Sequence, residues 1–181
     1  PIDEHDRAGV RKIIFVGSDT PLEHTRATFA EVLDGCASAP RPGQAGTWII
    51  PAMREAYLHL HALGHAHSVE VHDGGRLVGG IYGVAVGRMF FGESMFSAES
   101  GGSKAALAGL GQWLHGCGWP LIDAQVENDH LLRMGAERWP RAEFLAEVAR
   151  LAALPAEPGP WSEAFGRLPA AELAPPSPAG S

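Results

Sequence analysis

Apolar residues recur at three- and four-residue steps in the first part of the chain, a spacing typical of amphipathic helices. The first helix starts at Thr25, which can cap it, and its apolar stripe ends at Cys36. Pro51 opens a second helix, because proline fits a first helical turn, and Gly64 ends it. Before these helices, the apolar run at residues 13–16 predicts a short strand.

Alternating apolar and polar positions replace the helical spacing in the middle of the chain. They predict three antiparallel strands at residues 67–72, 76–86 and 88–96, with a hairpin turn at Asp73-Gly74-Gly75. Glycines inside these strands predict bulges or points of close backbone approach. The glycines concerned are Gly79, Gly80 and Gly92.

The last part of the chain returns to helical spacing with one strand in between. Ser103 is the predicted cap of a helix whose apolar stripe runs to Cys117, and a strand follows at residues 121–126. A short helix at residues 128–134 and a last helix opened by Pro140 complete the pattern. This order predicts an α+β, GNAT-like acyltransferase fold, with a mixed, mostly antiparallel sheet flanked by helices.

Length and composition divide the chain into three expected parts. Residues 1–24 form an N-terminal segment, residues 25–154 one catalytic domain, and residues 155–181 a Pro- and Ala-rich tail that is expected to be largely disordered. Because the chain begins at Pro1, either an initiator Met was removed or further residues precede it.

Charge and cysteine usage narrow the class of protein. A net charge of −7 opposes non-specific nucleic-acid binding, which depends on neutralising phosphates. The two cysteines lie far apart and indicate neither a disulfide framework nor a zinc site, so a reducing, cytoplasmic compartment is the simplest interpretation. No apolar run approaches the ~20 residues that a membrane span needs.

Three polar residues stand out in apolar strands. Glu93 follows Gly92 in an aromatic run, where a carboxylate needs a partner, a ligand or a raised pKa. We expect it at the floor of a binding site, with Met95 on the same strand face. Asp123 and Gln125 lie two residues apart, so their side chains should share one face of a strand. Asp123 and Gln125 form either a buried pair whose hydrogen bonds are satisfied or a reactive site, and both alternatives remain open.

The histidines between His59 and His67 have a plainer interpretation. His61 and His65 show a four-residue spacing that suits two metal ligands on one helical face. Gly64 breaks the helix between them, however, and no carboxylate lies at a matching spacing. Packing and capping roles are therefore favoured over a metal site.

Two further features bear on ligands. Trp48 is a core anchor or a stacking platform for a base, and the core is favoured. The glycine-rich pyrophosphate loop of coenzyme-A-dependent GNAT enzymes is missing, since Ser100-Gly101-Gly102-Ser103 does not match it. Lys104, beside that segment, could assist an anion but is more often solvated in such a position. The missing loop counts against an ordinary acetyltransferase.

Nine short motifs, in order from about residue 28 to residue 144, point to one family. They are Gly35-Cys36-Ala37, Thr47-Trp48-Ile49, Leu63–Glu70, Leu77–Gly83, Phe91–Ser97, Ser103-Lys104, Leu121–Gln125, Asp129-His130 and Gly135-Ala136. Together they make the chain similar to the leucyl/phenylalanyl-tRNA–protein transferases, cytoplasmic bacterial enzymes of the N-degron pathway.

The resemblance implies a GNAT-like domain whose donor is aminoacyl-tRNA, with no cofactor, metal or membrane required. It implies transfer of Leu, Phe or Met to the α-amino group of proteins that begin with Arg or Lys. Asp123 and Gln125 match the family's proposed catalytic pair, and Glu93 matches a contact to the 3′-terminal adenosine. The positions that match the donor side-chain pocket are Ile81, Met95, Leu107, Leu110 and Ile122, with the aromatic Trp48 at the same site.

Physical chemistry limits the roles of the pair. Aminolysis needs a neutral amine, and an α-amino group has a pKa of ~8, so only a modest push is needed to deprotonate it. Positioning of the two bound substrates can therefore supply most of the rate acceleration. An amide is not a useful base, which makes Gln125 an acceptor that orients the amine, with Asp123 polarising the network.

Family members also carry an N-terminal domain with a tryptophan-rich segment and a basic cluster, whose motifs this chain lacks. The alternatives are a GNAT acetyltransferase using acetyl-coenzyme A, and a non-catalytic module that binds N-terminal Arg or Lys.

Overall fold

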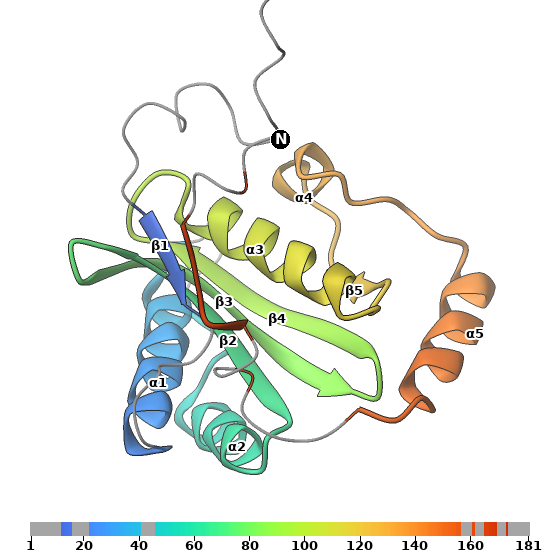
Figure 1. The fold of residues 1–181 in the computed structure, drawn as a ribbon, viewed down its shortest axis with the longest axis horizontal. Coiled ribbons are helices and arrows are strands. Elements are labelled where there is room, and N and C mark those ends of the chain that lie inside the picture. The colour runs from blue at the N-terminus through green and yellow to red at the C-terminus, as the bar shows by residue number, and fades with distance from the viewer. Residues whose placement is uncertain are drawn as a thin grey trace, which may run out of the picture.

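The structure, a computed structural model, describes residues 12–15, 22–40, 46–156, 161, 165–169 and 173. Its helices are α1 (Leu22–Ser38), α2 (Pro51–Ala62), α3 (Gly102–Gly116), α4 (Asp129–Arg133) and α5 (Arg141–Ala152) (Figure 1). Its strands are β1 (Lys12–Phe15), β2 (Ala66–Asp73), β3 (Arg76–Val86), β4 (Met89–Ser97), β5 (Ile122–Asp123) and β6 (Arg167–Pro169).

These strands form one six-stranded sheet in the order β5-β4-β3-β2-β1-β6. Neighbouring strands are antiparallel except β4 and β5, which run parallel because α3 connects them. The predicted α+β class, with a mixed, mostly antiparallel sheet flanked by helices, is confirmed. The strand at residues 76–86 and the hairpin turn before it are also confirmed, and the two turn glycines have φ of +57° and +83°.

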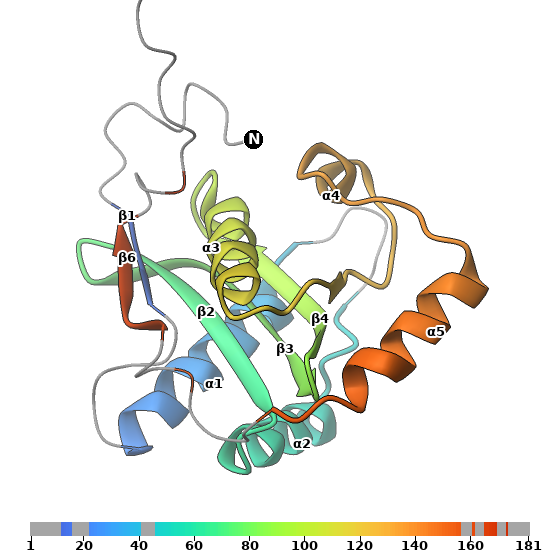
Figure 2. The same cartoon turned by 45° about the vertical axis from the view of Figure 1, so that its right-hand side comes forward.

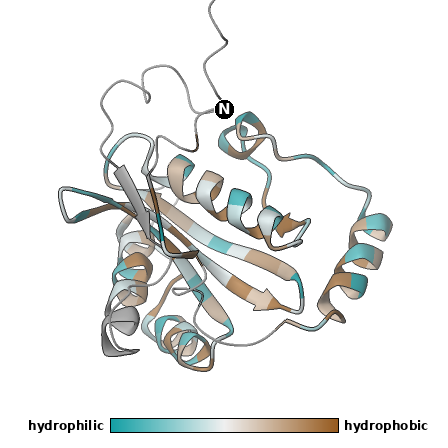
Figure 3. Cartoon of the chain, in the orientation of Figure 1, coloured by the Kyte–Doolittle hydropathy of each residue, from teal (hydrophilic) through white to brown (hydrophobic). Residues whose placement is uncertain are grey.

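Helices cover both faces of the sheet (Figure 2). One apolar cluster lies under α3 and includes Val69, Val71 and Leu110. A second lies under α1 and α2 and includes Phe29, Val32 and Tyr82. The odd-numbered valines of β2 face α3, as strand alternation requires. Figure 3 shows hydrophobic and hydrophilic residues together on the helices, and hydrophobic stretches on parts of the strands. In the part of the chain that the structure describes, no helix is long and apolar enough to cross a membrane.

Close backbone approach explains the glycines of β3. A Cβ at Gly79 would lie 2.5 Å from the backbone of Gly102, at the start of α3. A Cβ at Gly83 would lie 2.2 Å from the carbonyl oxygen of Phe91 on β4. No side chain fits at such distances, so the sequence prediction of close backbone approach at Gly79 is confirmed. The start of α3 therefore packs directly against the backbone of β3.

Three predicted helix features were wrong. Helix α1 begins at Leu22, so Thr25 lies inside it and is not its cap. The residue before α3 is Gly101, and the first turn is capped from β4 instead, where the Ser97 hydroxyl accepts a 2.8 Å hydrogen bond from the backbone N–H of Ser103. Cys117 is exposed beyond the last turn of α3 and does not join its apolar stripe. The Ser97 cap comes from another element, which helical spacing does not reveal.

Some of the described residues beyond Leu154 contact the rest of the chain. The indole of Trp161 stacks on His67 with ring centroids 3.8 Å apart, and β6 pairs with β1. Phe165 packs against Trp113 in the same aromatic group. The rest of the predicted tail, most of the predicted segment 1–24, and residues 41–45 of the loop before Trp48 lie outside the described residues.

Candidate functional site

A β-bulge in β4 organises the candidate site. Tyr82 pairs with Ser94 and Gly83 pairs with Gly92, so Glu93 is the extra residue on β4. Such a bulge re-aims the side chains around it. Phe90 and Met95 would face opposite ways in a regular strand, yet both pack into the cluster under α3.

The side chain of Glu93 instead meets α2. It forms a hydrogen bond with the phenol of Tyr57, and Tyr57 belongs to the cluster on the α1 and α2 face. Burial, together with this hydrogen bond, raises the pKa of the Tyr57 phenol above its ordinary value. The prediction that Glu93 and Met95 share a strand face was therefore wrong, because the bulge between them changes the alternation.

Trp48 lies next to this pair. Its ring meets Tyr57 edge to face with centroids 6.2 Å apart, and 40% of the residue is exposed. The ring of Tyr82 also meets the Tyr57 ring edge to face, with centroids 5.1 Å apart. The preferred prediction of a core role for Trp48 was wrong. An exposed indole beside a carboxylate is instead available to a planar ligand.

Asp123 and Gln125 come together, although by a different geometry from the one that their spacing predicts. Strand β5 ends at Asp123, and Gln125 has a left-handed backbone with φ of +58°. A carboxylate oxygen of Asp123 accepts a 2.8 Å hydrogen bond from the backbone N–H of Gln125, which closes a turn. The predicted strand at residues 121–126 was wrong beyond Asp123, so the two side chains do not share a strand face.

The side chain of Gln125 is anchored on the bulged strand. Its amide nitrogen, Nε2, donates a 3.0 Å hydrogen bond to the carbonyl oxygen of Gly92. A Cβ at Gly92 would lie 3.3 Å from the carbonyl oxygen of Asp123, tighter than an ordinary contact, so the glycine lets β4 and β5 approach. The anchored amide nitrogen leaves the amide oxygen as the free acceptor of this side chain.

The five apolar residues that the resemblance assigns to one pocket occupy one place. All of them belong to, or pack against, the cluster under α3, on the opposite face of the sheet from Tyr57. Two are buried and three are half-buried, so the group combines a rigid base with accessible side chains. The buried ones are Ile81 and Leu110, and the half-buried ones are Met95, Leu107 and Ile122.

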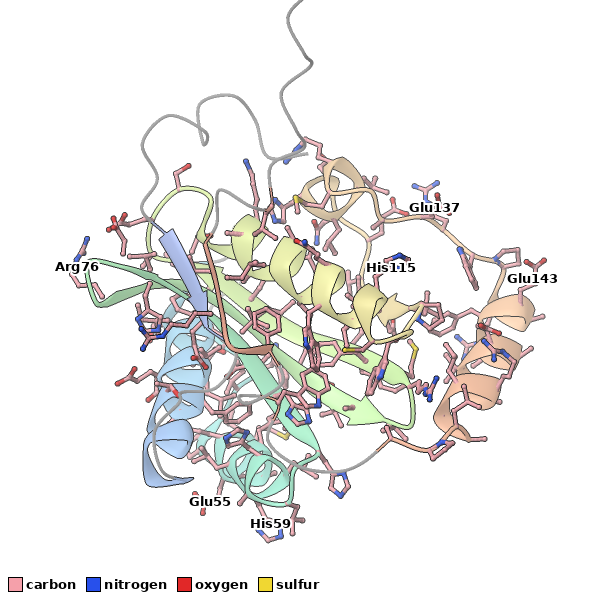
Figure 4. All side chains as sticks on the ribbon, in the orientation of Figure 1. Glu55, His59, Arg76, His115, Glu137 and Glu143 are labelled. Carbon is pink, nitrogen blue, oxygen red and sulfur yellow. The ribbon has the colours of Figure 1, made fainter. Side chains whose placement is uncertain are left out.

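His61 and His67 take packing roles, as predicted. His61 stacks on Phe29 with centroids 4.2 Å apart, and its Nδ1 donates to the carbonyl oxygen of Ala66 at 2.7 Å. Burial lowers the pKa of His67 to about 3, so this ring is neutral beside Trp161. His59 points away from the sheet (Figure 4). Among the residues that the structure describes, no group of His, Cys, Asp and Glu could hold a metal ion.

A cavity of about 310 Å³ lies apart from the predicted site residues. Its walls include His65, His67, Gly87, Trp119 and Trp161, and none of the predicted site residues lines it. The candidate site is therefore the surface around the bulge, where Glu93, Gly92 and Gln125 meet, and not this cavity.

Tyr57 and the Gly92 carbonyl are site components that the sequence did not single out. In the sequence, Tyr57 is one of several apolar positions on the same face of a helix. A backbone carbonyl is present in every residue, so the sequence cannot indicate which one takes part in a site. The unusual Gly-Glu pair in an aromatic strand was the available signal, since a bulge often follows a strand glycine.

Comparisons with known proteins agree on one family. A family model described as Leucyl/phenylalanyl-tRNA protein transferase matches residues 20–149. A leucyl/phenylalanyl-tRNA–protein transferase of Xanthomonas oryzae pv. oryzae (strain MAFF 311018) is 69% identical over 145 residues, which are 80% of this chain and 58% of that protein. The enzyme of the same name from Xylella fastidiosa (strain M23) is 65% identical over 138 residues, which cover 76% and 57%.

Solved structures show weaker likeness. A ribosomal-protein-alanine N-acetyltransferase from Brucella melitensis biovar Abortus 2308 is 16% identical with a TM-score of 0.47, and covers 72% of this chain and 96% of its own. An aminoglycoside N-acetyltransferase is 15% identical with a TM-score of 0.40, over 82% and 90%. Likeness at these scores supports no further statement about this chain.

The chain spans less than two thirds of the length of the curated relatives that it matches, and the aligned region covers 58% of the first of them. The family match covers most of the present chain, from the start of α1 into α5. The chain therefore belongs to the leucyl/phenylalanyl-tRNA–protein transferase family.

Proposed function

We propose that this chain carries the transfer site of an enzyme that moves Leu, Phe or Met from aminoacyl-tRNA to the α-amino group of proteins that begin with Arg or Lys. Family membership supports the reaction class. The observation that carries the proposal is the anchored amide of Gln125, whose nitrogen is held by the Gly92 carbonyl. Its oxygen is then free to accept a hydrogen bond from the attacking amine.

The reaction is an aminolysis of an ester. The amine nitrogen forms a bond to the ester carbonyl carbon, the carbon–oxygen bond to the ribose breaks, and the proton lost by the amine ends on the ribose hydroxyl. Because an α-amino group titrates near ~8, a useful fraction is neutral at pH 7 without a strong base. Gln125 then orients the amine, and Asp123 holds Gln125 in place.

The apolar group under α3 supports the choice of donor. It offers Met95, Leu107 and Ile122 as accessible apolar side chains. A methylene in such a pocket is worth only ~1–3 kcal/mol, so Leu, Phe and Met are accepted together.

In this proposal Glu93, at the bulge, contacts the 3′-terminal adenosine. Trp48, which the resemblance assigns to the donor pocket, lies instead against Tyr57 of the α1 and α2 cluster, apart from the five apolar pocket residues.

The packing at the start of α3 weighs against acetyl-coenzyme A as the donor. Gly102 touches β3, where an added Cβ would lie 2.5 Å from the carbonyl oxygen of Val78. The N–H of Ser103 already bonds Ser97. Gly102 thus allows close packing of α3 on β3. A pyrophosphate would instead need a loop whose backbone N–H groups are free to donate to it. A location in the bacterial cytoplasm, where aminoacyl-tRNA is made, is part of the same proposal.

The test is transfer of radiolabelled Phe or Leu from charged tRNA to a peptide that begins with Arg. The chain should transfer the label to this peptide and leave one that begins with Glu unlabelled. Gln125→Ala should lose most of the transfer, whereas Gln112→Ala, at an exposed glutamine of α3, should keep it. Binding of the Arg peptide without any transfer would instead identify a binding module and overturn the proposal.

A further inference from the structure

We propose that the cavity at the end of the sheet is a second binding site, which takes a flat, uncharged aromatic heterocycle of two fused rings. The cavity has a volume of about 310 Å³ and lies where α2 ends, β2 begins and β3 ends. None of the residues assigned to amino-acid transfer lines it. The proposal therefore goes beyond the proposed function and does not depend on it.

The size of the cavity suits a small ligand. Protein interiors pack closely and leave few voids larger than a water molecule. A cavity of about 150 Å³ holds one benzene ring, so 310 Å³ leaves room for two fused rings. Val86 belongs to the cavity wall and is 45% exposed, so the cavity reaches the surface at the turn between β3 and β4.

Aromatic rings give the cavity flat walls. The indole of Trp161 stacks on the imidazole of His67, with ring centroids 3.8 Å apart and planes inclined by 5°. Trp119 meets Trp161 at 85°, with centroids 5.5 Å apart, and all three residues line the cavity. Perpendicular indoles of this kind favour a flat aromatic ring, which can stack on one of them and meet the other edge to face.

The walls also favour a ligand without charge. Among the residues that the structure describes, no Asp, Glu, Lys or Arg lines the cavity. Burial lowers the pKa of His67 to about 3, so its ring is neutral near pH 7. A charged ligand would lose its hydration here and find no counter-ion. The imidazoles of His65 and His67 add nitrogens that can form hydrogen bonds, which suits a heterocycle with a polar ring atom.

The C-terminal segment supplies two of the walls. Ala156 and Trp161 line the cavity, and both lie beyond residue 149, where the match to the family model ends. Trp161 is held in place by further rings, since its centroid lies 4.6 Å from that of Trp113 and 5.7 Å from that of Phe90. A site built partly from residues outside the family match supports a role separate from the transfer reaction.

The experiment measures binding of indole to the full chain by isothermal titration calorimetry, with indole-3-acetate and cyclohexanol as comparisons. Indole should bind saturably. Indole-3-acetate carries the same rings with a carboxylate, and cyclohexanol is neutral but not flat, so each should bind roughly tenfold more weakly than indole. No saturable binding of indole, or equal affinity for indole and indole-3-acetate, would overturn the proposal.

A matched pair of variants locates the bound indole. Ala156→Phe adds a ring inside the cavity and should abolish binding. Ala153→Phe adds the same ring at an exposed position after α5 and should leave the affinity within about twofold of the unmodified chain. Gln125→Ala should slow transfer and keep indole binding, so this proposal and the proposed function can fail separately.

Thermal unfolding shows whether the cavity variant folds. Indole binding that survives in folded Ala156→Phe would place the ligand elsewhere and overturn the proposal. If Ala156→Phe does not fold, Trp119→Ala decides the matter, because it removes one of the two perpendicular indoles and should weaken binding several-fold. An unchanged affinity in that variant would equally overturn the proposal.

Discussion

The turn that Asp123 closes leads to a prediction that separates two roles for its carboxylate. In one, Asp123 acts through its negative charge on the reacting groups. In the other, it is an acceptor that holds the backbone of Gln125, as the 2.8 Å hydrogen bond suggests. Asp123→Asn removes the charge and keeps an oxygen at the same place, whereas Asp123→Ala removes both.

The size of the effect follows from the backbone. A left-handed conformation costs a residue with a side chain ~1–2 kcal/mol, and Gln125 has φ of +58°. The Asp123 hydrogen bond offsets this cost, being worth ~1 kcal/mol at an exposed position. Because 1.4 kcal/mol is about a factor of ten in rate, the loss of ~1 kcal/mol in Asp123→Ala should lower kcat roughly fivefold by depopulating the turn.

The two variants should then differ. If Asp123 works through the turn, Asp123→Asn keeps kcat within about threefold of the unmodified chain and keeps the same dependence of rate on pH. Single-turnover transfer of labelled Phe at saturating donor measures both variants, and thermal unfolding confirms that they fold. An Asn variant as slow as the Ala variant would refute the reasoning, because the charge and not the acceptor would then matter.

Three further predictions concern packing and pH. Gly92→Ala should slow transfer several-fold, because its Cβ would meet Asp123 at 3.3 Å and separate β4 from β5, whereas Gly111→Ala, with open space around its Cβ, should leave transfer unchanged and raise Tm slightly. Burial raises the pKa of Glu70 from 4.5 to about 8, so its contribution to the free energy of unfolding is complete below pH 4.5 and is lost as pH rises towards 8. Glu70→Gln should therefore make Tm nearly independent of pH between pH 6.5 and 8. The same slope of Tm against pH in the variant and the unmodified chain would contradict the assignment. His67 has the opposite sign, since burial lowers its pKa from 6.5 to about 3 and stability is lost as pH falls through that window; His67→Phe should lessen this loss in an acid titration followed by circular dichroism.

Local signals in the sequence predict the elements well. Pro51 and Gly64 bound α2 because each residue restricts the backbone by itself, and the two glycines after Asp73 set the hairpin turn in the same way. The nearly continuous apolar run of β3 is recognisable because both of its faces are covered. These features depend on neighbouring residues only, so a sequence contains what is needed to find them.

The details of the site depend on contacts between distant segments. Gly92 signals a bulge in β4, but the face of the sheet that Glu93 then takes depends on the pairing of Gly83 with Gly92, which involves a second strand. The resemblance identified Gln125, but its left-handed turn needs the Gly92 carbonyl from a strand more than thirty residues earlier. The Ser97 cap and the packing of Trp161 escaped prediction for the same reason.

The bond between Gln125 and Gly92 also has a consequence for self-association. Strand β5 pairs with β4 only at Phe90 and Phe91, so within the described residues the rest of that side of β4 has no strand beside it. An open strand edge is a template on which another chain can add. Gly92 carries the first carbonyl of this edge, and the Gln125 amide occupies it. Replacing Gln125 would therefore uncover a place where two copies of the protein can join edge to edge.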